Sequence, residues 1–71
     1  MLTTSEKFMV IMKRKGVTVD KLAQLSGETR QNLHRKFDMD DMKESDIRKY
    51  AKLMGYQAEV VFRDESTGDT L

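Results

Sequence analysis

The sequence predicts a mainly α-helical protein in which four short helices are followed by one C-terminal β-strand. Apolar residues recur at helical spacing in four segments, each bounded by threonine or serine, by glycine, or by an acidic stretch. After Gly55 the spacing changes to an alternation of period two, which is typical of a strand. A chain of 71 residues makes one domain, and 38% hydrophobic residues are enough for a small core.

The first helix begins after Thr3, because Thr3 and Glu6 have the spacing of a capping box. Its inward face is expected to consist of Phe8, Ile11 and Met12. Gly16 ends the helix, and the basic residues 13–15 lie in its last turn, where the helix dipole favours positive charge.

The second and third helices meet at a tight turn around Gly27, which can adopt the positive φ that ends a helix. Thr18 is the expected N-cap of the second helix, and Thr29 is that of the third. The expected inward residues of the two helices are Val19, Leu22, Ala23, Leu33 and Phe37. Because Ala23 is small, the helices can cross closely, which leaves the third helix with one buried face and one free face.

An acidic connector, residues 38–44, leads to a fourth helix that starts near Ser45 and stops at Gly55. The inward residues of this helix are expected to be Ile47, Ala51 and Met54. The strand follows, with Ala58, Val60 and Phe62 alternating with Glu59, Val61 and Arg63. We therefore expect one domain at residues 1–63, and a polar tail at residues 64–71.

Charge is distributed unevenly along the chain, although the net charge is only +1. The first 36 residues hold eight basic and three acidic residues, whereas the remainder holds five basic and nine acidic ones. A basic first half favours a surface that attracts polyanions such as nucleic acid. Two ordinary solvated surfaces with segregated charges would give the same distribution.

Residues 17–55 resemble the helix-turn-helix domain of the phage repressor and Cro type, the XRE-like family. The matching residues are Thr18, Leu22, Ala23, Gly27, Thr29, Leu33, Leu53, Met54 and Gly55, together with the triplet Gln31-Asn32-Leu33 found in short members. The resemblance covers a little over half of the chain and implies a lambda-repressor-like fold, with residues 1–63 as the DNA-binding domain. Two positions depart from the family pattern. Val19 stands where many relatives have a polar residue, and Lys36 stands where many have an aliphatic one, whose contact we expect Phe37 to supply.

The resemblance implies a cytoplasmic, sequence-specific transcriptional regulator that binds double-stranded DNA. A repressor of this kind occupies a pseudo-palindromic operator as a dimer, with two third helices in successive major grooves about 34–36 Å apart. The alternative is a protein-interaction module, such as the antitoxin partner of a toxin, that acts through its strand edge or its fourth helix.

Helical geometry predicts which residues of the third helix face DNA. When its apolar residues point inward, Gln31 and Arg35 point most directly outward, and Arg30 and Asn32 lie in the exposed first turn. Glutamine and asparagine can read adenine with two hydrogen bonds, and arginine can read guanine. These four residues are therefore the candidates for base contacts. A solvated helix face is the alternative interpretation.

Phosphate contacts are expected from residues at or near helix N-termini, where backbone N–H groups favour anions. Thr18, Lys21 and Thr29 occupy such positions, and Lys36 can reach the DNA backbone from the far end of the third helix. An ordinary solvated surface position is the alternative for each lysine.

The predicted strand has no partner within the chain, because the tail after Gly68 is too short for a convincing return strand. We therefore predict that it pairs with the same strand of a second subunit and makes a symmetric homodimer. The residues expected in this dimer strand are Glu59, Val61 and Arg63. The alternative is a strand-like arm that lies over the helices of its own subunit.

Catalysis and cofactor binding find no support in the sequence. His34 is the only histidine, the chain has no cysteine, and the acidic connector lacks the central glycine of a calcium loop. We therefore expect no enzymatic activity, no cofactor and no metal site. The longest apolar run, residues 8–12, is far too short for a membrane span, and no secretory signal pattern occurs, so a cytoplasmic location is the default expectation.

Overall fold

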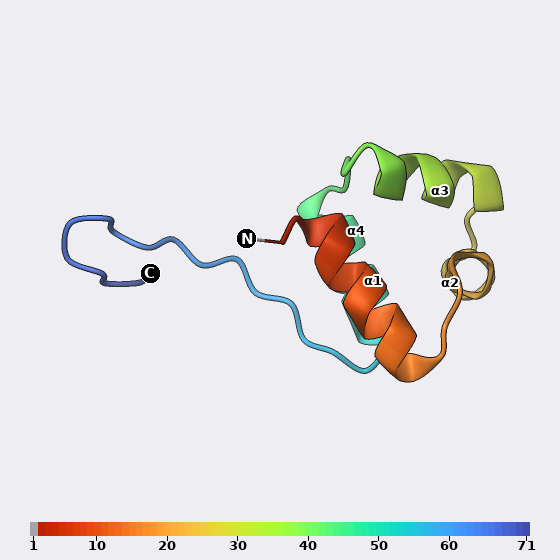
Figure 1. The fold of residues 1–71 in the computed structure, drawn as a ribbon, viewed down its shortest axis with the longest axis horizontal. Helices are drawn as coiled ribbons and strands as arrows, with labels where there is room; N and C mark the ends of the chain where they lie inside the picture. The colour runs from red at the N-terminus through yellow and green to blue at the C-terminus, as the bar shows by residue number, and fades with distance from the viewer. Residues whose placement is uncertain (1) are drawn as a thin grey trace.

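The computed structural model describes residues 2–71 and contains four helices within that range. They are α1 (Thr4–Lys15), α2 (Val19–Ser26), α3 (Arg30–Asp38) and α4 (Glu44–Leu53). Figure 1 shows the helices gathered at one end of the molecule, while the chain after α4 runs along them and then away. The prediction of a mainly α-helical protein with four helices is confirmed. Within residues 2–71, no helix has the length and apolar character needed to cross a membrane.

The predicted caps define the first three helices. The Thr3 hydroxyl accepts the Glu6 N–H at 3.1 Å, and the Glu6 carboxylate accepts the Thr3 N–H at 2.9 Å, which completes the capping box. The Thr18 and Thr29 hydroxyls each accept an N–H from the first turn of α2 and α3, at 3.1 and 3.2 Å. These bonds satisfy amide groups that have no partner inside the helix.

The fourth helix begins at Glu44, one residue before the expected start. Lys43 takes the N-cap position, and its N–H donates to the Asp46 carboxylate at 3.2 Å. A carboxylate in the first turn is favoured by the helix dipole. Asp46 thus caps the helix from its first turn.

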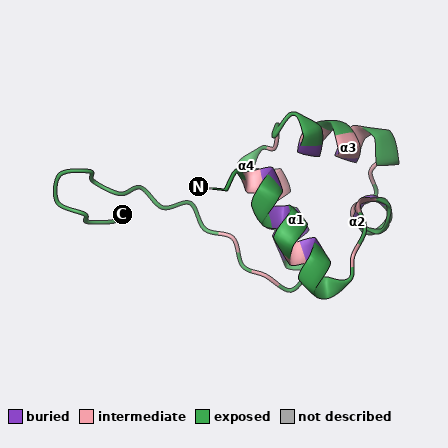
Figure 2. Ribbon diagram, in the orientation of Figure 1, coloured by how far each residue is buried: buried purple, intermediate pink, exposed green. Residues whose placement is uncertain are grey.

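The core lies where the helices meet and is centred on three aromatic rings. Phe8 from α1, Phe37 from α3 and Tyr50 from α4 lie with ring centroids 6.0 to 6.4 Å apart. The other buried apolar residues are Met12, Leu22, Ala23, Leu33, Ala51 and Met54. Figure 2 shows these buried segments on the inward sides of the helices. Three residues that were expected to point inward lie half-buried at the margin: Ile11, Val19 and Ile47.

A polar contact joins the start of α1 to the connector after α3. Asp40 accepts both the backbone N–H of Ser5, at 2.8 Å, and its hydroxyl, at 2.6 Å. These hydrogen bonds lower the pKa of the Asp40 carboxyl. Asp40 has a positive φ of 50°, which turns the chain sharply after α3. Through Asp40, the acidic connector therefore holds the start of α1 against the end of α3.

The prediction of a C-terminal β-strand is wrong for the described residues 2–71. Their only β pairing is one isolated antiparallel bridge between Arg63 and Thr70. The segment that follows α4 is extended, and it packs against side chains of α1 and α4 instead of against a neighbouring strand. A β-strand needs a second backbone with free N–H and C=O groups to pair with, and the helices use theirs internally.

The tail folds back on the preceding residues, although it was expected to be too short for a return strand. The Leu71 N–H donates to the Phe62 carbonyl at 2.9 Å, and the Asp64 N–H donates to the Asp69 carbonyl at 2.7 Å. The Asp64 carboxylate accepts two hydrogen bonds from Ser66 and closes the turn. Residues 62–71 thus form a small hairpin-like loop at the end of the chain. Figure 1 shows this loop far from the helices.

Candidate nucleic-acid interface

Helices α2 and α3 form the helix-turn-helix unit on which the candidate interface is built. Gly27 ends α2 with φ 76°, and the Glu28 N–H donates back to the Ala23 carbonyl at 3.0 Å. Leu22 and Leu33 are fully buried between the helices. These contacts fix one face of α3 to the protein and leave the opposite face open to solvent.

The outer face of α3 carries the residues that were expected to read bases. Gln31 and Arg35 are both exposed on it, and Arg30 is exposed in the first turn. A shallow hollow follows this face, and its lining residues are Arg30, Gln31, His34, Arg35, Asp38 and Met39. The structure therefore brings three of the four base-contact candidates together on one solvent-facing surface.

Two carboxylates at the edge of the face hold the arginines. Arg30 Nε lies 2.9 Å from Asp20 Oδ1, and His34 Nε2 lies 3.4 Å from the same oxygen. Arg35 Nη1 lies 3.4 Å from Asp41 Oδ2. Exposed ion pairs of this kind contribute about 0–1 kcal/mol, so the arginines can exchange these carboxylates for a polyanion at little cost.

Asn32 differs from the other candidates because its amide already has partners. It is half-buried, and its Nδ2 donates to Glu28 Oε1 at 3.3 Å. Its Oδ1 accepts a hydrogen bond from Arg35 Nη2 at 3.2 Å. Asn32 therefore connects the turn after α2 to the guanidinium group of Arg35.

The expected phosphate-contact residues Thr18, Lys21 and Thr29 lie at the N-terminal turns of α2 and α3 and are exposed. Each threonine hydroxyl accepts a cap hydrogen bond, which leaves its own hydrogen able to donate to a phosphate oxygen. These three residues remain candidates for phosphate contacts.

Lys36 lies elsewhere. Its side chain is only 13% exposed, and Nζ lies 2.7 Å from Glu28 Oε1 and 3.3 Å from Asp46 Oδ2. Nζ also donates to the Tyr50 hydroxyl oxygen at 3.1 Å, and the Tyr50 hydroxyl donates to Glu28 Oε2. The three donors of the Lys36 ammonium are thereby occupied, which leaves none for the DNA phosphate that Lys36 was expected to contact.

This cluster of Glu28, Lys36, Asp46 and Tyr50 was not expected from the sequence. The hydrogen bond to Glu28 raises the pKa of Lys36 well above its ordinary value. Burial would raise the pKa of Glu28, but hydrogen bonds from Lys36 and Tyr50 outweigh burial and lower it. The one signal in the sequence was Lys36 itself, a charged residue at a position where an apolar one was expected.

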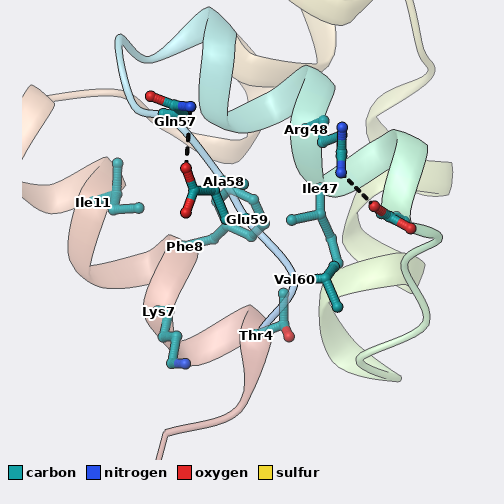
Figure 3. Close-up of a pocket in the computed structure, with 11 residues that line it drawn as sticks. Thr4, Lys7, Phe8, Ile11, Ile47, Arg48, Gln57, Ala58, Glu59 and Val60 are labelled. Carbon is teal, nitrogen blue, oxygen red and sulfur yellow. Dashed lines mark hydrogen bonds and ion pairs between the residues drawn. The ribbon is translucent and has the colours of Figure 1, made fainter. Parts of the chain in front are cut away.

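The C-terminal segment bounds a second surface feature. A groove lies between α1, α4 and the chain after α4, and Figure 3 shows its apolar side chains, among them Phe8, Ile47 and Ala58. Ala58 is half-buried there, whereas Val60 is 51%, Val61 55% and Phe62 71% exposed. The expected dimer residues Glu59, Val61 and Arg63 are all exposed on this extended segment.

Comparison with known proteins gave no match to a family model, to a curated protein or to a solved structure.

Proposed function

We propose that this protein is a sequence-specific DNA-binding regulator that inserts α3 into the major groove. The observation that carries the proposal is the two-sided character of α3. Leu33 and Phe37 are buried in the core, while Gln31 and Arg35 are exposed on the opposite face. Recognition helices of helix-turn-helix proteins use this arrangement to present polar side chains to base edges.

In the proposed complex, Arg35 reads guanine, and Gln31 reads adenine. Arg30 and Asn32 in the first turn are further candidates for base contacts, and Thr18, Lys21 and Thr29 hold the phosphate backbone. The proposed activity is binding, not catalysis, and it needs no cofactor. Because the target is DNA, we propose a cytoplasmic location.

We propose further that the protein binds as a homodimer, pairing through residues 59–63. The support is an extended segment whose side chains Val60, Val61 and Phe62 are exposed. An antiparallel pair centred on Val61 sets Glu59 opposite Arg63 of the partner subunit, which joins opposite charges across the interface. Such a dimer would match a pseudo-palindromic operator and repress transcription by blocking polymerase or a competing regulator.

The test is selection from a library of randomised DNA duplexes at two salt concentrations, followed by sequencing of the retained DNA. A two-fold symmetric consensus that survives the higher salt supports the proposal. Retention that collapses with salt and leaves no consensus contradicts it, because phosphate attraction alone behaves in this way.

Single substitutions assign the reading residues. Arg35→Ala and Gln31→Ala are each expected to lower specific affinity by ~1–3 kcal/mol and to relax preference at one base pair. Lys52→Ala is the matched control, because Lys52 is an exposed basic residue of α4 that lines a different surface hollow, with Tyr56 and Gln57. Unchanged affinity and consensus in both α3 variants would contradict the assignment.

A second candidate function is binding to a protein partner, such as the toxin of a toxin–antitoxin pair. The observation that favours it is the exposed run Val60-Val61-Phe62 beside the apolar groove. Substitutions at Val61 or Arg63 would then abolish activity while Gln31→Ala and Arg35→Ala are tolerated. The two functions can coexist in one protein, so both sets of variants belong in the same assay.

A further inference from the structure

A chain of hydrogen bonds leads from the core of the protein to the exposed arginine of α3. The hydroxyl of the fully buried Tyr50 donates to one oxygen of the Glu28 carboxylate. The other oxygen accepts from Lys36 Nζ at 2.7 Å and from Asn32 Nδ2 at 3.3 Å. Asn32 Oδ1 then accepts from Arg35 Nη2 at 3.2 Å.

We propose that Glu28 and Lys36 are positioning residues for base recognition, acting through Asn32 to orient the guanidinium group of Arg35. The proposal rests on the function proposed above and deepens it. The largely buried ion pair of Glu28 and Lys36 would then influence which base is preferred, in addition to stabilising the fold.

The orientation of the Asn32 amide supports this assignment. Its NH₂ group faces the Glu28 carboxylate, which only accepts hydrogen bonds, and its oxygen faces the Arg35 guanidinium, which only donates them. The reverse orientation of the amide would oppose donor to donor and acceptor to acceptor. Asn32 therefore presents an acceptor to Arg35 for as long as Glu28 holds the other end.

Lys36 is what keeps the Glu28 carboxylate in place. The carboxylate is only 15% exposed, so it needs a compensating charge, and Lys36 supplies it from within α3 itself. Lys36 also pairs with Asp46 of α4 at 3.3 Å. The turn after α2, the last turn of α3 and the start of α4 are thereby joined by one ammonium group.

A fixed Arg35 would have an energetic advantage in recognition. Its Nη2 donates to Asn32 Oδ1 at 3.2 Å, which orients the guanidinium group before DNA arrives, whereas the exposed Asp41 carboxylate, 3.4 Å from Nη1, is exchanged for DNA. A side chain that is already ordered loses less rotamer freedom on binding a base. This chain of hydrogen bonds from Glu28 through Asn32 to Arg35, the relay, therefore affects the preference for the base pair that Arg35 reads more than it affects phosphate attraction.

The test compares two double variants that differ in one acceptor. Glu28→Leu with Lys36→Met removes both charges and the acceptor for Asn32, whereas Glu28→Gln with Lys36→Met removes the charges but keeps an acceptor oxygen. Both are put through the duplex-library selection beside the unmodified protein. The base pair read by Arg35 is defined as the one whose preference Arg35→Ala abolishes.

The expected result is that the leucine variant loses about three- to tenfold of the preference at that base pair, while the glutamine variant retains more of it. Glu44→Leu with Arg48→Met is the matched control, since it also removes one acidic and one basic residue that form an ion pair. In that pair Arg48 Nη2 lies 2.6 Å from Glu44 Oε1, and both side chains are exposed on α4. The control is expected to keep the unmodified consensus.

Three results overturn the proposal. The first is a leucine variant that keeps the full preference at the Arg35 base pair. The second is a leucine variant that loses affinity equally for every sequence, as a merely structural ion pair would. The third is equal relaxation in the leucine and glutamine variants. If the unmodified protein selects no consensus, the proposed function itself fails, whereas the variant results above refute only the positioning role of Glu28 and Lys36.

A further variant tests the relay if the leucine variant does not fold. Asn32→Ala leaves the Glu28–Lys36 pair intact and interrupts the path to Arg35. It is expected to relax preference at the Arg35 base pair in addition to any base that Asn32 reads itself. An unchanged preference at the Arg35 base pair overturns the proposal.

Discussion

The ring of Phe8 stacks on the ring of Phe37, with centroids 6.1 Å apart and 11° between the ring planes. This contact joins α1 to the last turn of α3. Phe37 thus makes the core contact expected of it, next to Lys36, whose ammonium group lies in the ion-pair cluster. Tyr50 meets both rings edge-on, so each of the three aromatic side chains touches the other two.

Removal of the Phe37 ring should therefore destabilise the whole protein. We expect Phe37→Ala to lower the free energy of unfolding by about 3–4 kcal/mol, because the ring is buried and the cavity is bordered by two other rings. Urea denaturation followed by circular dichroism measures the change. Met39→Ala is the control, since Met39 is 67% exposed. A loss below about 1 kcal/mol for Phe37→Ala would contradict the packing described here.

Breaking the buried ion pair from one side should cost more than removing both charges. Lys36→Met leaves the Glu28 carboxylate without its counter-charge, and we expect a loss of about 2–4 kcal/mol in unfolding free energy. Glu28→Leu in the same chain should restore part of that loss, since no unpaired charge remains. The same denaturation experiment measures both variants. Equal stability of the single and double variants would show that the pair is not buried in solution.

Stability should decrease in alkaline solution. Burial and the hydrogen bond to Glu28 raise the pKa of Tyr50 to about 12 from its ordinary 10.0, and the pKa of Lys36 is raised as well. Between pH 10 and 12 the unfolded chain has lost the tyrosine proton that the folded protein retains, so the free energy of unfolding falls as pH rises. The Tyr50 contribution is expected to be about 2 kcal/mol. It is fully present below pH 10.

Tyr50→Phe tests this explanation, because phenylalanine does not titrate. Unfolding free energies measured from neutral pH upward should fall less steeply in this variant, because the Tyr50 contribution to the slope is removed. Identical slopes in the two proteins would rule out Tyr50 as a source of the alkaline loss.

Substitution of Gly27 should lower the stability of the protein. A Cβ built at this position meets nothing within 4 Å, so the penalty comes from the backbone, which has φ 76°. Gly27→Ala is expected to lower stability by about 1–2 kcal/mol, and Gly27→Asn by less, because asparagine tolerates the left-handed region better. Thermal unfolding of both variants decides between backbone strain and steric crowding. Steric crowding would make the larger asparagine the more damaging substitution.

Local signals in the sequence were sufficient to place the helices. The capping box at Thr3, the caps at Thr18 and Thr29, and the glycine at the end of α2 all act over a few residues, so the sequence alone predicts each of them. The buried face of α3 followed from the spacing of Leu33 and Phe37.

Contacts between distant residues were not predictable in the same way. Lys36 meets Glu28, Asp46 and Tyr50 because three separate segments converge, and no spacing along the chain encodes that convergence. The sequence places Asp40 in the acidic connector and gives no sign of its hydrogen bond to Ser5, which lies 35 residues away. The strand prediction was wrong because an alternation of residue types shows only that side chains point to opposite sides of an extended segment. It does not show that a neighbouring strand is present to pair with that segment.

The extended segment after α4 has a consequence for solubility. Its apolar run Val60-Val61-Phe62 is exposed and lies between two charges, Glu59 and Arg63. Parallel in-register stacking of many copies, the arrangement of amyloid fibrils, would place Glu59 on Glu59 and Arg63 on Arg63, and like charges in that position repel. Antiparallel pairing of two copies places the opposite charges together. Glu59 and Arg63 therefore disfavour the parallel in-register fibril in particular.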